Sequence, residues 1–132
     1  EIYTLSLHDA LPILAYMSES VKKNNSFIDL KELEDMFLMK KKGIVCATIT
    51  DVEDKSFKDK STGERKKFGK INLQQNIDTA TIILWSDVWE DLKGVFLKSV
   101  GKILVCVAQV KWSDYDEKNT LQLNKGAFYQ II

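Results

Sequence analysis

Histidine and cysteine are scarce in this sequence, which has one histidine (His8) and two cysteines (Cys46 and Cys106) among 132 residues. A structural zinc site needs four nitrogen or sulfur ligands, so we expect no metal and no other cofactor. Both cysteines lie inside apolar runs, which is typical of buried free thiols in a reducing compartment, and we expect a cytoplasmic protein. Because these runs are expected to form neighbouring strands, a disulfide between them stays an open alternative.

Long apolar runs and an excess of charge of one sign are also missing. No run approaches the roughly 20 apolar residues of a membrane-spanning helix, so we expect no membrane partner. Nineteen basic and nineteen acidic residues cancel, so the net charge does not indicate a polyanionic partner. The sequence contains neither a phosphate-binding glycine loop nor a nucleophile with a base. We therefore expect no catalytic residues and no enzymatic activity of this chain on its own.

The first methionine is Met17, so we expect a fragment of a longer protein. Residues 3–13 resemble a translated sequencing adaptor. A signal peptide is the alternative, and it is disfavoured because no basic residue precedes the apolar stretch at 10–15, which Pro12 interrupts. We therefore expect residues 1–25 to be a non-native or disordered leader and linker without functional residues.

Residues 26–42 are expected to form a short packing helix. Ser26 is suited to the N-cap position and Asp29 to an acidic first turn. Gly43, after three lysines, is typical of a helix end. The apolar residues at helical spacing are Ile28, Leu30, Leu33, Phe37 and Leu38. We expect this helix to cover one end of the domain that follows.

Residues 43–132 predict a mainly β domain, because apolar and polar residues alternate over several short segments. The expected strands cover residues 43–52, 68–74, 79–85, 102–112 and 119–124, with a turn at 55–64 and a helix at 86–98. Ser86 is the expected N-cap of this helix, and Gly69 fits a strongly bent strand. Five antiparallel strands with a helix between the third and fourth are the arrangement of the oligonucleotide-binding (OB) fold, a small barrel.

Three segments carry a more specific resemblance, namely Gly43-Ile-Val-Cys-Ala-Thr-Ile-Thr-Asp-Val52, Ile71-Asn-Leu73 and Ala80-Thr-Ile-Ile-Leu-Trp-Ser-Asp-Val-Trp89. Because these three segments follow one another in this order, residues 43–132 resemble the OB domain near the carboxyl end of the bacterial DNA polymerase III alpha subunit. The resemblance implies a replicative DNA polymerase as the full-length parent, with its catalytic carboxylates on a separate domain. Other replication proteins are then expected partners.

Several positions depart from that family's pattern. Trp85 and Ser86 stand where the family commonly has phenylalanine and proline, Lys70 replaces a bulky apolar residue, and Gln74-Gln75 replaces Glu-Asp. Anticodon-binding domains of aminoacyl-tRNA synthetases share the broader pattern, so they stay an alternative.

The segment 55–70 is strongly basic, with seven lysines or arginines against two acidic residues. Such a local excess attracts phosphate even in a neutral chain, although a merely solvated loop would have the same composition. By alternation, Phe68 and Trp85 point away from the core, where bases of single-stranded DNA or RNA could stack on them. The predicted nucleic-acid-binding residues are Lys58, Lys60, Arg65, Lys66, Lys67, Phe68, Lys70, Asn72, Thr81, Trp85, Lys111 and Trp112, with Tyr115 and Lys118 as further candidates.

Other interpretations of these residues stay open. Trp85 could pack beneath the helix, Phe57 is expected to pin the hairpin to the barrel, and Trp89 is expected to face the core. A protein-interaction OB domain would instead use an exposed Ile83 and the acidic turn at 114–117. An accessory domain without a ligand is a further alternative, and the sequence does not separate DNA from RNA.

Overall fold

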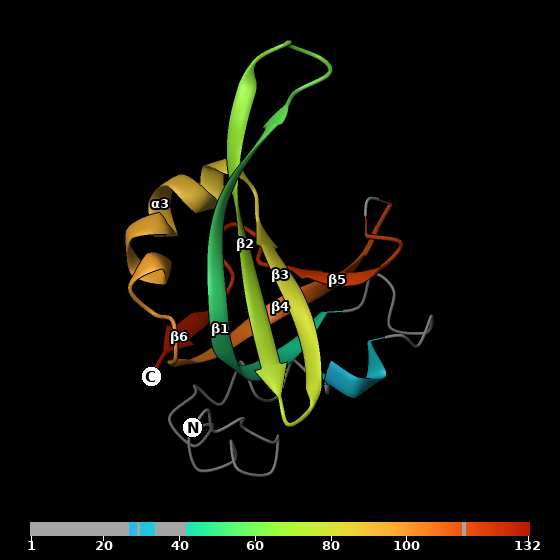
Figure 1. The fold of residues 1–132 in the computed structure, drawn as a ribbon, viewed down its shortest axis with the longest axis vertical. Helices are drawn as coiled ribbons and strands as arrows, with labels where there is room; N and C mark the ends of the chain where they lie inside the picture. The colour runs from blue at the N-terminus through green and yellow to red at the C-terminus, as the bar shows by residue number, and fades with distance from the viewer. Residues whose placement is uncertain (1–26, 29, 34–41, 115) are drawn as a thin grey trace.

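The computed structural model describes residues 27–28, 30–33, 42–114 and 116–132 (Figure 1). Its strands are β1 (Lys42–Lys58), β2 (Arg65–Gln75), β3 (Asp78–Leu84), β4 (Ile103–Ser113), β5 (Lys118–Gln122) and β6 (Tyr129–Ile131). The helix α3 (Ser86–Leu97) connects β3 to β4, and the 3-10 turn η1 (Leu30–Glu32) precedes β1. The predicted mainly β architecture, with a helix between the third and fourth strands, is confirmed.

Five of the strands close into a ring in the order β1-β2-β3-β5-β4 and back to β1. β1 is long enough to pair with two neighbours, because residues 42–48 pair with β4 and residues 48–58 pair with β2. The register shift between Ile49 and Asp51 lies just past this change of partner, where a bulge bends the strand. A short parallel pairing of β3 with β5 completes the ring, although the sequence pattern predicted antiparallel pairing throughout.

The core fills the inside of this ring. Alternation along β2 and β3 works as predicted, since Ile71, Leu73, Ile82 and Leu84 are fully buried. The first strand differs from the prediction, because both of its faces are buried near its start. Ile44, Cys46 and Val105 form a second apolar cluster outside the ring, next to Phe128.

The two cysteines are free and buried. Val45 pairs with Cys106 and Cys46 pairs with Val105, so the two thiols project from opposite faces of the β1–β4 pair. Cys106 joins the main core, whereas Cys46 joins the second cluster. Burial raises the pKa of both thiols to about 12.

The helix α3 closes one end of the barrel with Trp89, which is 1% exposed, as the sequence predicted. The indole of Trp89 lies directly on Gly69, where a Cβ atom would overlap Cε3 and lie 2.6 Å from Cδ2. Gly69 therefore makes room for the tryptophan. The predicted N-cap was wrong by one position. Trp85, in extended conformation, is the N-cap without a side-chain bond, and Ser86 already lies inside the first turn.

The described residues before β1, 27–28 and 30–33, pack under the other end of the barrel. Ile28, Leu30 and Leu33 are buried in the main core. The side-chain amides of Gln75 and Asn119 hydrogen-bond to the backbone of these residues. The Leu30 N–H donates to Oε1 of Gln75 (3.3 Å), and Nδ2 of Asn119 donates to the Leu33 carbonyl (2.7 Å).

Of the helix predicted at 26–42, only a part can be compared. Phe27 forms a bridge with Ile44, and Lys42 opens β1, so these positions are extended rather than helical. Backbone pairing with β1 and β4 outweighs the helical spacing there. Ser26, Asp29 and residues 34–41 lie outside the described residues.

Two strand boundaries also differ from the sequence prediction. β1 and β2 continue beyond the barrel as a two-stranded ribbon, visible as the long projection in Figure 1, so the turn spans only residues 59–64. β6 was not predicted, and it pairs with β4 outside the ring. None of the helices in the described residues is long and apolar enough to cross a membrane.

Candidate nucleic-acid interface

The register of β1, β2 and β3 decides which side chains share a surface. Lys55 lies opposite Phe68, and Lys70 lies opposite Ile83. Directly paired residues project to the same side of a sheet, and residues two apart share a face. One outer surface of the barrel, which we call the groove face, therefore carries Lys55, Phe57, Lys66, Phe68, Lys70, Asn72, Thr81 and Ile83.

Three aromatic side chains form a cluster on the groove face. The ring centroids of Phe68 and Trp85 are 5.3 Å apart, and those of Phe57 and Trp85 are 5.4 Å apart. Phe57 and Phe68 are half-buried, whereas Trp85 is 42% exposed. The indole N–H of Trp85 donates to Oε1 of Gln122 on β5 (3.2 Å). Trp85 therefore packs on the two phenylalanines rather than beneath the helix and leaves part of its ring available.

A groove of about 380 Å³ lies beside this aromatic cluster, between the β2–β3 surface and the β4–β5 hairpin. It brings together the predicted residues Phe68, Lys70, Trp85, Lys111 and Trp112. The remaining lining residues are Lys55, Ile83, Ser113, Asp114, Asp116, Thr120, Leu121 and Gln122. Most of the surface that these residues expose to the groove belongs to apolar atoms, which suits a flat heteroaromatic ligand more than a small ion.

Trp112 forms the far wall of the groove and is 49% exposed. Its indole N–H donates to Oδ1 of Asp114 (3.1 Å), and the Asp116 N–H donates to Oγ of Ser113 (3.1 Å). The carboxylates of Asp114 and Asp116 also line the groove, so this end repels phosphate. Tyr115 lies outside the described residues.

Two lysines in the groove keep their charges available. Within the described part of the chain, Lys70 and Lys111 make no ion pair with a carboxylate. Lys55 lies 3.8 Å from Glu53, and both side chains are exposed, so that pairing is weak. The groove therefore combines aromatic walls with two lysines that make no ion pair among the described residues, while the carboxylates of Asp114 and Asp116 lie at its far end.

The groove face continues past Lys70 into a second hollow of about 400 Å³, which Asn72, Thr81 and Lys118 also line. Oγ1 of Thr81 donates to Oδ1 of Asn72 (3.3 Å), whose Nδ2 donates to Glu53 (3.3 Å). These predicted residues thus lie on the expected surface. Their polar atoms already have partners, and Thr81 is buried.

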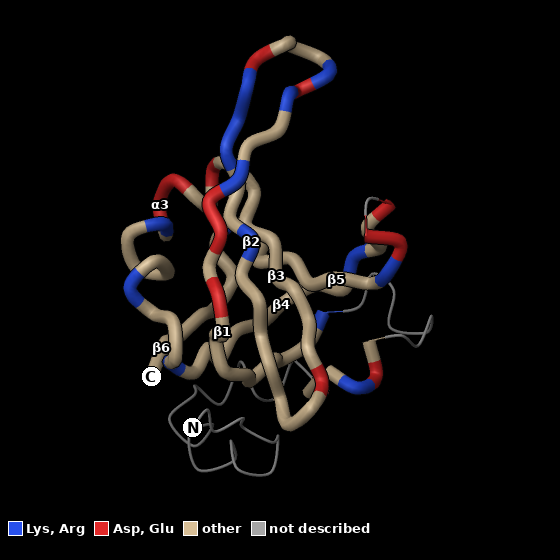
Figure 2. Tube along the Cα trace, in the orientation of Figure 1, with Lys and Arg blue, Asp and Glu red and all other residues tan. Residues whose placement is uncertain are grey.

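The other predicted basic residues divide between two surfaces. Lys58 pairs with Arg65 and Ser56 pairs with Lys67, which places these three cations on the opposite, α3-facing side of the ribbon. Figure 2 shows cations on both strands of this ribbon. Lys67 lies 3.6 Å from Asp54, which also binds Lys93 (2.7 Å). The structure therefore does not bring all predicted lysines to one groove.

The ribbon tip has its own ion pair. Asp59 accepts hydrogen bonds from the hydroxyl (2.7 Å) and the N–H (2.9 Å) of Ser61 and lies 3.0 Å from Nζ of Lys66. These contacts hold the pKa of Asp59 well below its ordinary value, and Asp59 in turn raises the pKa of Lys66. Lys66 is thus partly neutralised, while Lys60 is exposed in the turn.

Some residues in or beside the groove were not predicted as binding residues. Lys55, which lines the groove, and Phe57, which belongs to the aromatic cluster beside it, were assigned to a turn, and Thr120 and Gln122 were not considered as binding residues. The sequence did contain a signal for Lys55 and Phe57. The alternation of the first strand continues through these two residues, which predicts that the strand extends beyond Val52. Ile83, proposed only as a protein contact, is half-buried in the groove.

No family model matches the sequence, and no curated protein matches it. Solved structures do match. A replication protein A heterotrimer bound to ssDNA has a TM-score of 0.58 and 16% identity, over 81% of this chain and 24% of that one. The second OB-fold domain of replication protein A from Methanococcus maripaludis has a TM-score of 0.51 and 18% identity, over 71% of this chain and 86% of that one. The fold is an OB-fold.

A third similar structure is an aspartyl-tRNA synthetase from Entamoeba histolytica, with a TM-score of 0.60 and 12% identity. The match covers 88% of this chain but only 23% of the synthetase. This chain therefore spans less than a quarter of the length of that synthetase. The groove of this chain lies on the β2–β3 face, next to the turn between β4 and β5.

Proposed function

We propose that this OB-fold binds single-stranded nucleic acid, and single-stranded DNA in particular, along the groove. The exposed ring of Trp85, set against Phe57 and Phe68 beside two lysines that make no ion pair in the part of the chain that the structure describes, carries this proposal. The β2–β3 face with its flanking loops is the surface on which OB-folds bind oligonucleotides and oligosaccharides. Cations next to aromatic rings favour a nucleic acid over a neutral sugar.

The two kinds of side chain have separate tasks in this proposal. Trp85 and Trp112 provide flat surfaces on which bases stack, each stack contributing roughly 1–3 kcal/mol. Lys70 and Lys111 neutralise phosphates and release counterions, which makes the affinity depend on salt. Because neither contact reads a base edge, we expect little sequence preference from the groove itself.

Similar structures support the choice of ligand without deciding it. One similar structure is replication protein A bound to ssDNA, and another is RecG bound to a three-way DNA junction. Aspartyl-tRNA synthetases are among the similar structures too, so RNA binding is the second candidate function. Comparison of oligothymidine with oligouridine separates the two.

We further propose that the parent protein is a bacterial DNA polymerase III alpha subunit, on the strength of the three segments quoted above. In this proposal the chain acts in the cytoplasm, by binding alone, next to other replication proteins. Any polymerase chemistry belongs to a separate domain of the parent.

The test is a fluorescence anisotropy titration of labelled oligothymidine, about 12 nucleotides long, with the full chain at low and moderate salt. The variant Lys70→Glu/Lys111→Glu reverses both groove charges. The matched control Lys98→Glu/Lys102→Glu makes the same charge change at exposed positions beyond α3. We expect salt-dependent binding that the first variant loses and the control retains.

The proposal would be refuted if the folded chain bound neither oligothymidine nor oligouridine at low salt. A protein-interaction OB domain would then be the better account. Equal losses in the two double variants would show that net charge, and not the groove, governs binding.

A further inference from the structure

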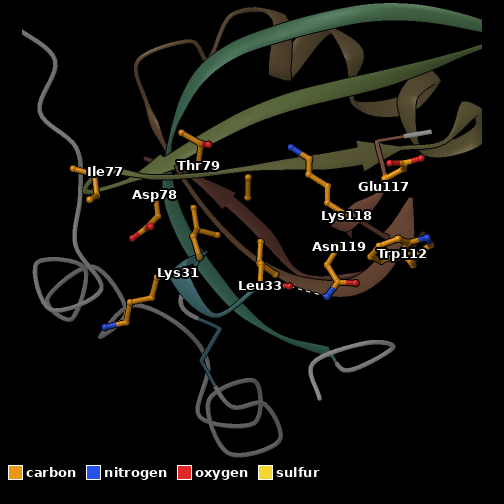
Figure 3. A pocket seen from close by; sticks show the side chains of 11 residues that line it. Lys31, Leu33, Ile77, Asp78, Thr79, Trp112, Glu117, Lys118 and Asn119 are labelled. Carbon is orange, nitrogen blue, oxygen red and sulfur yellow. Dashed lines mark hydrogen bonds between the residues drawn. The ribbon is translucent and has the colours of Figure 1, made fainter. Parts of the chain in front are cut away.

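A larger hollow, of about 560 Å³, lies under the barrel between η1, the β2–β3 turn and the start of β5. Figure 3 shows its walls, with Asp78 and Thr79 towards one end and Lys118, Asn119 and Trp112 towards the other. Leu30 and Leu33 supply an apolar floor. This hollow lies outside the groove, and the function proposed above does not use it.

Asn119 in this hollow has a hydrogen-bond acceptor without a donor. The residue is only 9% exposed, and its Nδ2 donates to the Leu33 carbonyl at 2.7 Å. That bond requires a donor, so it fixes which end of the amide is nitrogen and which is oxygen. Among the described residues, Oδ1 of Asn119 is the buried side-chain atom that has no hydrogen-bond partner. A buried acceptor left in this state destabilises the folded protein, and a ligand N–H that bonds to it would recover the loss.

Trp112 connects this hollow to the groove. Its side chain lines both, and it lies opposite Asn119 in the β4–β5 register. Figure 3 shows the two side chains next to each other. The indole is half exposed, and its N–H bonds to Asp114 in an exposed turn. A strand in the groove can therefore continue past Trp112.

The polar group that decides selectivity is Oδ1 of Asn119, the buried acceptor that has no donor among the described residues. The charges that line the hollow balance, with the carboxylates of Asp78 and Glu117 against the ammonium groups of Lys31 and Lys118. Lys118 lines both this hollow and the second hollow next to Lys70, which suits a phosphate outside it. Adenine, cytosine and guanine carry an exocyclic amino donor. Thymine and uracil offer an N–H between two carbonyl acceptors, which would face acceptors here.

We propose that this hollow is a base-binding subsite that takes one amino-bearing nucleobase of the strand in the groove. The base lies against Trp112, and its amino group donates to Oδ1 of Asn119. This proposal rests on the proposed function and adds to it a preference for base identity at one position of the bound strand. The groove alone would give no such preference.

The experiment uses the full chain and a series of oligothymidines in which a single adenine occupies each position in turn. A matched series carries purine, the adenine analogue without its 6-amino group, at the same positions. We expect adenine to bind about fivefold tighter than thymine at one position, because one recovered hydrogen bond contributes about 1 kcal/mol. Purine there should lose this gain, although it stacks like adenine.

The variant Asn119→Leu should bring the adenine-to-purine affinity ratio to one, and tryptophan fluorescence checks that it folds. If it does not fold, the comparison of adenine with purine on the unmodified chain decides alone. Equal affinities of adenine, purine and thymine at every position would overturn the subsite while leaving the proposed function intact. Absence of binding to every oligonucleotide would overturn both.

Discussion

Replacement of Gly69 by alanine tests how the barrel end is closed. The added Cβ would overlap Cε3 of Trp89 and lie 2.6 Å from its Cδ2. The indole is 1% exposed and its N–H bonds to Asp54 (3.0 Å), so it cannot retreat without leaving the core or losing that bond. We therefore expect Gly69→Ala to lower the free energy of unfolding by about 3 kcal/mol, the upper part of the range for overpacked cores.

Gly94 offers a matched control, because it lies in the exposed interior of α3 and a Cβ there would meet no atom within 4 Å. Alanine is favoured over glycine inside a helix by about 0.5–1 kcal/mol. Gly94→Ala should therefore stabilise the protein. The same chemical change is expected to have opposite signs at the two positions.

The assay is urea unfolding followed by tryptophan fluorescence, with the free energy of unfolding obtained by linear extrapolation. A loss of less than about 1 kcal/mol for Gly69→Ala, no more than an average substitution, would refute the packing argument. Trp89→Leu gives an independent check, since the cost of alanine at position 69 should shrink in that background.

Three further results are expected. Trp85→Ala should weaken oligothymidine binding by roughly 1–3 kcal/mol in anisotropy titrations, whereas Leu97→Ala on the exposed side of α3 should not change it. Hydrogen bonds from Lys93 and Trp89 lower the pKa of Asp54 to about 2, so its stabilising effect is present at neutral pH and is lost as the pH falls from about 4 through about 2. Thermal melts should show that Asp54→Asn removes part of this acid dependence, and identical pH profiles of the two proteins would contradict the assignment. Burial raises the pKa of Cys46 and Cys106 to about 12, so a thiol reagent should label them only after unfolding; rapid labelling of the native protein would contradict this.

The sequence predicted the barrel well wherever one face of a strand meets the core. Ile71 and Leu73 alternate with Phe68 and Lys70, and burial of the first pair fixes the direction of the second. The aromatic part of the candidate site was predictable for this reason. Phe68 and Trp85 therefore lie together outside the core, as the alternation predicted.

Prediction failed where no core imposes the pattern. In the projecting ribbon, residues 55–58 and 65–67 are polar apart from Phe57, so composition suggested a turn and did not show that the cations divide between two sides. β6 is too short to give a periodic signal. The Asn119–Leu33 hydrogen bond joins residues 86 positions apart, and no local pattern predicts such a contact.

The order in which the ring closes matters during synthesis on the ribosome. β1, β2 and β3 emerge first and can form a three-stranded sheet, but the partners that close the ring, β4 and β5, follow only at residues 103–122. Until then the start of β1 and the free side of β3 are unpaired strand edges, and the apolar side chains of Val45, Ala47 and Ile82 lack their cover. Chains interrupted before β4 are therefore the species that should aggregate or recruit chaperones.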